Sequence, residues 1–238
     1  MSDTKNSILP DIIEPMSNAI QQNIPETARQ ADGALSTVVG FFNNVVLYPV
    51  KKANLTFRYK LEAFEDDLKE KIKDIPEENL QVPPVKIAGP VLEALRYAYD
   101  EAELREMYEE MLATAMDNRK AQQVHRSYVD AVRQMEPLDA QVLRRINDYN
   151  QITISHVKLY LAESQQQYYI NAMPYHYNAA LCDLGDPFQI SASISNLLRL
   201  GLLISTAGFL NEGVAERIEK EPYIQKRFGL YSQLPGGV

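Results

Sequence analysis

Apolar residues recur mostly at spacings of three and four along this chain, which predicts helices. Between residues 51 and 74, apolar positions close to a heptad seam alternate with acidic and basic residues. We therefore expect one long helix that buries a single face and ends before Pro76. The apolar positions of this helix are Phe57, Leu61, Phe64, Leu68, Ile72 and Ile75.

The segment 34–48 contains no charged residue, and its apolar residues form one stripe at helical spacing. Two partners of the stripe remain possible. It packs against protein, either the helix at 51–74 or an oligomer core, or it lies on a membrane surface with Lys51 and Lys52 as anchors. The candidate membrane or oligomer contacts are Leu35, Val38, Val39, Phe41, Phe42, Val45 and Val46.

Prolines divide the middle of the chain. A connector at 76–90 is expected to hold one helical turn at 77–80, and Pro90 is predicted to be the first residue of the next helix. Another helix is expected from Asp100. Two shorter helices should follow, the first capped by Ser127 and the second starting at Pro137. The residues of the Asp100 helix expected to point inward are Leu104, Met107, Tyr108, Met111, Leu112 and Ala115.

The C-terminal third is less regular. Residues 150–180 allow either short strands or a helix from His156 to Ile170. A helix over 191–200 is expected to end at Gly201 in the left-handed conformation, and a strand at 202–205 should follow it. Residues 215–227 predict a last helix. Two helices followed by a strand suggest a winged-helix-like unit.

These patterns predict a mainly α fold, a helical bundle with a small C-terminal winged-helix-like unit. We expect a polar, proline-dotted and mobile segment at 1–30, a helical region at 31–135 and the C-terminal unit at 136–238. A chain of 238 residues is long enough to bury a core without cross-links.

Charge and composition exclude several classes of function. The net charge of −8 is spread along the whole chain, which argues against nucleic acid as a partner. One cysteine allows no internal disulfide and fits a reducing compartment. The N-terminus does not resemble a secretory signal, and no apolar stretch reaches the length of a membrane span. We expect a cytoplasmic protein, with peripheral attachment at the inner membrane left open.

No set of residues forms a recognisable active site. None of the three histidines has a His or Cys partner three or four positions away, so no metal site is expected, and the cluster Tyr175-His176-Tyr177 is interpreted as aromatic packing. The glycine patterns of phosphate-binding loops are absent, so no cofactor is expected. Glu103, Glu106 and Glu110 share a helix face, which we interpret as solvated and paired with Arg105. The predicted catalytic set is empty.

Four blocks of sequence resemble the Abi-alpha (abortive infection alpha) family of bacterial phage-defence proteins. The first runs from Ile75 to Leu95 and contains Ile-Pro-Glu-Glu-Asn-Leu, Pro-Pro and Ile-Ala-Gly-Pro-Val-Leu-Glu-Ala-Leu. The second lies at 103–117, the third joins Val124-His125 to Pro137-Leu138-Asp139-Ala140, and the last covers 194–202. The resemblance implies a role in abortive infection, in which an infected cell stops growing or dies before phage matures. It supplies no catalytic residue.

We therefore expect a non-enzymatic defence protein that acts by protein association and by contact with a membrane surface. A homo-oligomer and a phage or host protein are the expected partners. One alternative is a winged-helix-type nucleic-acid-binding or regulatory protein, with Arg144, Arg145, Arg199, Lys226 and Arg227 as candidate contacts. Another is a sensor of a phage component, favoured by the tyrosines between residues 149 and 177.

Overall fold

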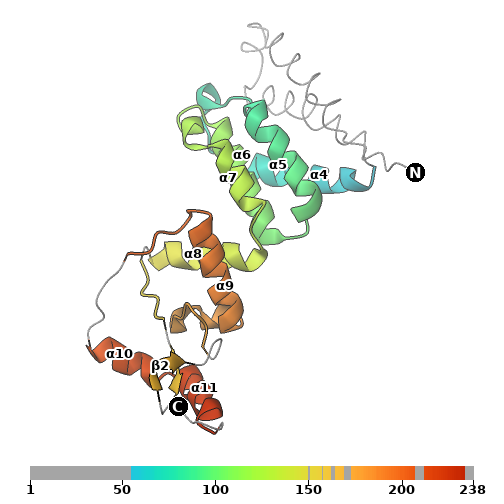
Figure 1. Cartoon of the computed structure of the whole chain (residues 1–238). Coiled ribbons are helices and arrows are strands. Elements are labelled where there is room, and N and C mark those ends of the chain that lie inside the picture. Colours follow the sequence, from blue (N-terminus) through green and yellow to red (C-terminus); the bar gives the residue numbers. More distant parts are fainter. Residues whose placement is uncertain are drawn as a thin grey trace, which may run out of the picture. The chain divides into compact units, whose positions relative to one another are not determined.

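The computed structural model describes residues 55–149, 151–156, 158–161, 164–168, 173–206 and 212–233. The chain divides into two compact units, Met1–Gln134 and Met135–Val238. Helices dominate the described part of both units (Figure 1), so the predicted mainly helical fold is confirmed. Within those residues, no helix combines the length and the apolar character that crossing a bilayer requires.

In the first unit, helix α6 (Ala102–Met116) is central. Helices α4 (Leu55–Ile72), α5 (Val85–Ala98) and α7 (Arg126–Val132) all pack against it. The helix predicted over 51–74 corresponds to α4, and the helix predicted from Asp100 starts two residues later than expected.

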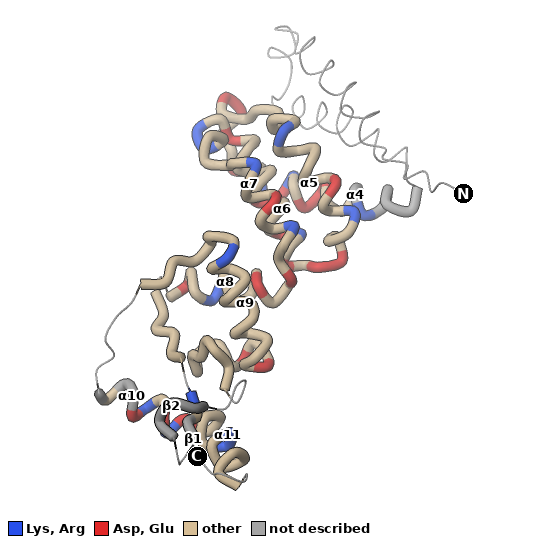
Figure 2. The backbone as a smooth tube through the Cα atoms, in the orientation of Figure 1, with Lys and Arg blue, Asp and Glu red and all other residues tan. Residues whose placement is uncertain are grey.

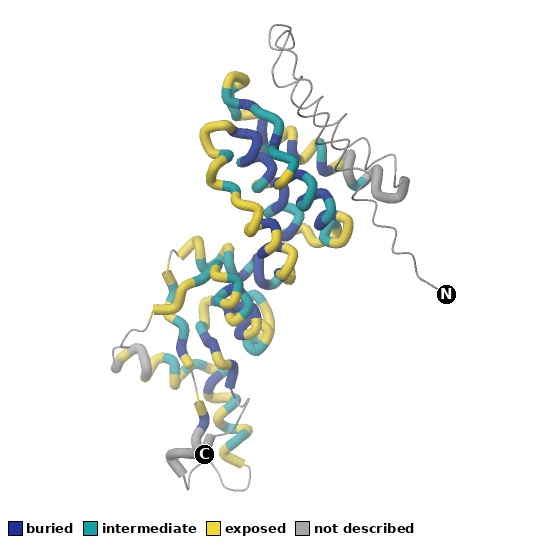
Figure 3. Tube along the Cα trace, turned by 45° about the horizontal axis from the view of Figure 1, so that its top comes forward, coloured by how far each residue is buried: buried dark blue, intermediate teal, exposed yellow. Residues whose placement is uncertain are grey.

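The core of this unit lies where these helices meet (Figure 3). Phe64, Leu68 and Ile72 of the predicted stripe are buried, whereas Ile75 is half-buried. Most of the positions that we expected to point inward from α6 are buried as well. This agreement follows from helical periodicity, which places residues three and four apart on one face. The buried side chains that carry the core are Phe64, Leu68, Ile72, Val91, Leu95, Leu104, Tyr108, Leu112 and Met116.

Short 3-10 helices complete the unit. The helical turn predicted at 77–80 is present as η3 (Glu77–Asn79), and η4 (Ala121–Gln123) follows α6.

The predicted start of α5 at Pro90 is wrong, because the helix begins at Val85 and contains Pro90. Pro84 occupies the N-cap position, and its carbonyl accepts hydrogen bonds from the N–H groups of Ile87 and Ala88. Proline inside a helix removes one hydrogen bond to the carbonyl four residues earlier. That residue is Lys86, which is exposed, so water can solvate its carbonyl.

The predicted N-cap of α7 at Ser127 is also wrong. His125, not Ser127, is the N-cap residue, and its Nδ1 accepts a hydrogen bond from the Ser127 N–H at 3.2 Å. The Ser127 hydroxyl lies 2.8 Å from the same nitrogen. An imidazole nitrogen can therefore satisfy a free N–H at a helix start, which is the task that hydroxyl and carboxylate side chains usually perform.

In the second unit, α8 (Pro137–Tyr149) packs against α9 (Pro187–Arg199), and both contact the 3-10 helix η5 (Ala179–Leu184). The start of α8 at Pro137 agrees with the prediction. Helix α9 starts before the predicted 191–200, because Asp186 caps it by accepting hydrogen bonds from the N–H groups of Phe188 and Gln189.

Helix α9 ends as predicted. Gly201 has a φ of 71°, and its N–H donates to the Leu198 carbonyl while the Leu202 N–H donates to the Leu197 carbonyl. This pair of bonds is a Schellman motif. The strand predicted at 202–205 is wrong, because those residues form bends and irregular chain. The winged-helix-like arrangement remains a prediction.

Residues 150–180 contain strands where described. Strands β1 (Tyr160–Leu161) and β2 (Ser164–Tyr168) pair antiparallel, so the alternative of a helix across 156–170 is wrong. A separate bridge joins Ser155 to Tyr177.

The helix predicted over 215–227 is two helices, α10 (Glu212–Glu219) and α11 (Pro222–Tyr231). Pro222 forces the preceding Glu221 into an extended conformation, which ends α10. A small core lies beside α11, formed by Leu159, Met173, Tyr177 and Ile224.

Candidate functional site

Few titratable side chains are buried in the described residues. Besides serines and tyrosines, the buried polar side chains are Glu109, Asp117, Asp139 and His176. Acidic and basic residues are otherwise interspersed along the helices of each unit (Figure 2). A buried charge needs compensation, so these four positions are where the fold places unusual chemistry.

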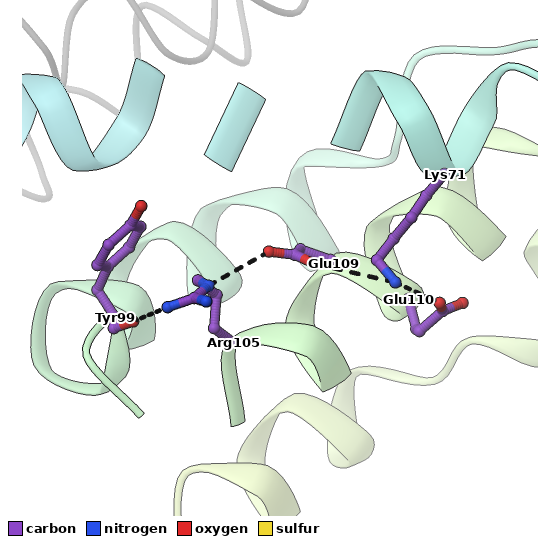
Figure 4. A network of polar contacts seen from close by, with 5 residues as sticks. All are labelled: Lys71, Tyr99, Arg105, Glu109 and Glu110. Carbon is purple, nitrogen blue, oxygen red and sulfur yellow. Dashed lines mark hydrogen bonds and ion pairs between the residues drawn. The ribbon is translucent and has the colours of Figure 1, made fainter. Parts of the chain in front are cut away.

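Glu109 lies on α6 between two cations from different elements (Figure 4). Arg105, one turn earlier on the same helix, places Nε 3.6 Å from Glu109 Oε1. Lys71 comes from α4 and places Nζ 3.9 Å from Glu109 Oε2 and 2.6 Å from Oε1 of the exposed Glu110. Both contacts to Glu109 are long, and its Oε1 has no hydrogen-bond partner in the structure.

This environment raises the pKa of Glu109 from its ordinary value of 4.5 to about 7. Burial is the largest cause, because it removes water from the charged form. The nearby Asp67 and Glu106 carboxylates raise the pKa further, while Lys71 and Arg105 lower it. The Glu109 carboxyl can therefore take up and release a proton near neutral pH.

Arg105 also ties α6 to the end of α5. One of its terminal nitrogens donates to the Tyr99 carbonyl at 2.7 Å, and its guanidinium lies 5.0 Å from the centre of the Tyr99 ring. Lys60 of α4 lies over the same ring at 5.2 Å and forms an ion pair with Asp100 at 2.6 Å. Two cations from different helices thus contact one tyrosine, a favourable cation–π arrangement.

In the second unit, the side chains of His156, Tyr175 and His176 form an aromatic cluster. His156 lies parallel to Tyr175 at 4.3 Å between ring centres, and His176 meets both rings edge-on at 5.1 Å and 4.7 Å. His176 is buried and its Nδ1 has no hydrogen-bond partner in the structure. Burial lowers the pKa of His176, and the neighbouring His156 lowers it further. The aromatic packing interpretation fits this geometry.

Cys182 lies in the small core beside Tyr177. Its Sγ donates weakly to the Asn178 carbonyl at 3.6 Å, and burial raises the pKa of its thiol. A raised pKa leaves less of the nucleophilic thiolate at neutral pH. Within the described ranges, no three His, Cys, Asp or Glu side chains are grouped as a metal site would need.

The family model for Abortive infection alpha matches residues 56–231. The chain belongs to the Abortive infection alpha family. No curated protein and no solved structure matches the chain.

The first two family blocks meet through backbone hydrogen bonds. The Gln81 N–H donates to the Met116 carbonyl at 2.8 Å, and the Asn118 N–H donates to the Asn79 carbonyl at 2.8 Å. The turn after η3 is thereby joined to the end of α6. The family residues in these blocks accordingly build a contact between distant parts of the chain.

Asp117 fixes the turn beside this contact. Its carboxylate accepts from the Arg119 N–H at 3.0 Å and from the Arg119 guanidinium at 2.8 Å and 2.7 Å. These charge-assisted bonds lower the pKa of Asp117 to about 2.

The third and fourth family blocks meet at Asp139. Its Oδ2 accepts from the Glu136 N–H at 2.9 Å and from the Asn196 amide at 2.8 Å. Asn196 Oδ1 in turn accepts from the Arg199 guanidinium at 3.1 Å and 2.8 Å. Asp139 caps the start of α8 and holds α9 against it, so this hydrogen-bonded set has a structural task.

The candidate nucleic-acid contacts are distributed over three helices of the second unit. Arg145 on α8 forms a two-bond ion pair with Asp183 at 3.0 Å and 2.9 Å. Arg227 on α11 lies 5.1 Å from the Phe188 ring and 5.3 Å from the Tyr231 ring. Arg199 bonds Asn196 on α9, as described above. Arg144 lies on α8 and Lys226 on α11. Nucleic-acid binding by these residues remains a prediction.

The candidate membrane or oligomer contacts between Leu35 and Val46 lie outside the described residues. Sequence reasoning also missed Glu109, since it chose Glu103, Glu106 and Glu110 as the acidic face. A signal was present: Glu109, Ala113 and Met116 are spaced by four and three residues, and all three are buried. The Arg105–Glu109 spacing of four was a second signal.

Proposed function

We propose that this protein acts in abortive infection by associating with protein, and that it performs no enzymatic reaction of its own. Membership of the Abortive infection alpha family supports the biological role. The proposed location is the cytoplasm, with contact at the inner membrane. A second copy of the chain is the first proposed partner, and a phage or host protein is the second.

Exposed aromatic side chains carry the association part of this proposal. Tyr97 on α5 is 80% exposed, and Tyr175 and Tyr149 in the second unit are 59% and 54% exposed. Phe228 and Leu230 on α11 are exposed as well. Large aromatic side chains are enriched in protein interfaces, because they bury much area at a small entropy cost.

Two of the four buried polar groups, Asp117 and Asp139, support a non-enzymatic role. Asp117 and Asp139 are occupied by hydrogen bonds that hold turns and helices together. The partly exposed Arg145 and Asp183 pair with each other across α8 and η5. Side chains held in these hydrogen bonds and ion pairs stabilise the fold.

Phage challenge tests the biological role. Cells that express the protein should survive as a population at a low ratio of phage to cells, with fewer phage released per infected cell. At a high ratio the same culture should stop growing or lyse. Survival of individual cells at the high ratio, or an unchanged phage yield, would contradict abortive infection.

Sedimentation velocity tests the association. The Tyr97→Ser variant should shift the purified protein toward the smaller species and should weaken protection against phage. Lys86→Ser is the matched control, because Lys86 is exposed on the same helix. Equal sedimentation of wild type and Tyr97→Ser across the concentration range would exclude α5 from the interface.

Flotation with vesicles tests the membrane contact proposed for the uncharged segment 34–48. Wild-type protein should float with vesicles that contain anionic lipid, and the Phe41→Ser/Phe42→Ser variant should remain at the bottom of the gradient. Unchanged flotation together with unchanged protection would contradict a role of this segment at a membrane.

A further inference from the structure

Helix α4 is seated on the rest of the first unit mainly through α6. Its buried stripe of Phe64, Leu68 and Ile72 faces inward, and its cations reach two other elements. Lys71 contacts Glu109 and Glu110 of α6, and Lys60 contacts Asp100 just after α5. The Glu109 carboxyl therefore lies at the contact between α4 and α6.

We propose that Glu109 makes the seating of α4 on α6 depend on pH, so that α4 stays in place when this carboxyl is protonated and detaches more often when it is ionised. The proposal concerns the stability of one helix contact and does not rest on the proposed function.

The geometry of the carboxyl carries the proposal. Glu109 is 5% exposed, and its Oε1 has no hydrogen bond in the structure. Its two cations lie at 3.6 Å and 3.9 Å, beyond the distance of a strong charge-assisted bond. The ionised form is thus deprived of water without receiving full compensation, and detachment of α4 would return the carboxyl to water.

The surrounding charges do not remove this cost. From α4, Lys71 favours the ionised carboxyl and Asp67 opposes it. From α6 itself, Arg105 favours ionisation and Glu106 opposes it. Arg105 is also shared with the Tyr99 carbonyl, and Lys71 is closer to Glu110 than to Glu109.

Tyr99, just after α5, also interacts with the Glu109 charge, whereas the ion pair that joins α5 to the end of α7 lies elsewhere. Glu93 of α5 pairs with Arg133 just after α7 at 3.8 Å. Arg133 and Asp130 act on Tyr108, the neighbour of Glu109 on α6. Consecutive residues on a helix point in different directions, so these groups face another side of α6.

Proton linkage gives the size of the effect. The pKa of Glu109 is about 7 with α4 in place and returns toward its ordinary 4.5 when water reaches it. Between pH 6 and pH 8 the detached fraction should rise about tenfold, because the detached form binds fewer protons in that range.

Hydrogen exchange of the full chain tests the proposal. After correction for the intrinsic effect of pH on exchange, protection of the α4 amides between Phe64 and Ile72 should fall about tenfold from pH 6 to pH 8. In Glu109→Gln the pH effect should vanish. Glu93→Gln is the matched control, since Glu93 on α5 pairs with Arg133 and does not act on Glu109, and it should keep the wild-type response.

A second variant keeps the test decisive if Glu109→Gln folds poorly. Lys71→Met removes a cation that lowers the pKa of Glu109, so the midpoint of the pH response in α4 should move to higher pH. The proposal is overturned if the wild-type change is below about threefold, if α5 and α7 lose protection equally, or if Glu109→Gln or Lys71→Met responds to pH as the wild type does.

Discussion

Replacement of Asp139 by alanine tests whether the contact between the last two family blocks holds the second unit together. The buried Asp139 Oδ2 accepts two hydrogen bonds, one from the Glu136 N–H at the start of α8 and one from the Asn196 amide of α9. Asp139→Ala removes both bonds and leaves both donors without their acceptor.

The magnitude follows from the cost of each lost bond. A lost hydrogen bond to a carboxylate costs about 1.5–3 kcal/mol, and two are lost; the lower figure applies because the Glu136 N–H and the Asn196 amide are only part-buried. Loss of the helix cap is one part of this cost, typically about 1 kcal/mol. We expect Asp139→Ala to lower the unfolding free energy of the second unit by about 3 kcal/mol. That is a large share of the stability of an ordinary domain.

Hydrogen exchange of the α8 and α9 amides is the suitable measurement, because it reports the second unit separately from the first. Asp148→Ala is the matched control: Asp148 is an exposed carboxylate on the same helix, and its loss should change the free energy by less than about 0.5 kcal/mol. A double-mutant cycle with Asn196→Ala should give a coupling of about 1–2 kcal/mol.

Two results would refute this reasoning. A loss below about 1 kcal/mol for Asp139→Ala would mean that water replaces the missing carboxylate at little cost. Additive losses for Asp139→Ala and Asn196→Ala would mean that the bond between the two residues does not couple α8 to α9.

Three further predictions concern other parts of the fold. Gly201→Ala should cost about 1 kcal/mol by chemical denaturation, because Gly201 adopts a φ of 71° in open space and only its backbone conformation is penalised; Gly201→Asn should cost less, and equal losses would contradict this cause. Leu112→Ala should cost about 3 kcal/mol in the first unit, because Leu112 is fully buried on α6; a loss below about 1 kcal/mol would mean that the core refills the space. His176 has a lowered pKa in the folded state, so its contribution to stability should be present above the unfolded pKa of about 6.5 and be lost as pH falls further. Thermal melts of His176→Phe should therefore show a weaker acid destabilisation than the wild type. An unchanged acid response would assign the destabilisation to other groups.

The sequence was sufficient for those features that local periodicity encodes. The buried positions Phe64, Leu68 and Ile72 follow from spacing alone, since any helix over that segment places them on one face. The left-handed conformation of Gly201 was equally predictable, because a glycine after an apolar helical run is the usual left-handed cap. In both cases the physical cause lies within a few residues.

Competition between local signals explains the errors. Pro90 can start a helix, but Pro84 can precede a helix start equally well. With Pro84 at the N-cap, α5 includes Pro90 and loses one hydrogen bond. Ser127 has the usual chemistry of a cap, but His125 occupies the N-cap position and its Nδ1 accepts from the Ser127 N–H. Sequence alone does not rank two nearby caps.

Helical spacing could place Glu109 on the buried face of α6, but it could not supply the pKa of its carboxyl. The pKa of Glu109 is raised mainly by burial, and the charges of Lys71 and Asp67 come from α4, about 40 residues earlier in the chain, so both effects depend on tertiary packing. Its neighbours Glu106, which is half-buried, and Glu110, which is exposed, look the same as sequence. The burial of Glu109 separates their chemistry, since the same carboxyl has an ordinary pKa when water surrounds it.

The positions of the family blocks suggest where function must be sought. The blocks at 75–95 and 103–117 meet through backbone bonds, and those at 137–140 and 194–202 meet through Asp139 and Asn196. Residues used in this way fix the framework of each unit, and a framework can be shared by proteins that contact different partners. The exposed tyrosines and the pH-dependent contact of α4 at Glu109 lie outside these hydrogen-bonded contacts. Substitutions at the exposed tyrosines should therefore alter protection without unfolding the protein, whereas substitutions at Asp139 should remove protection and stability together.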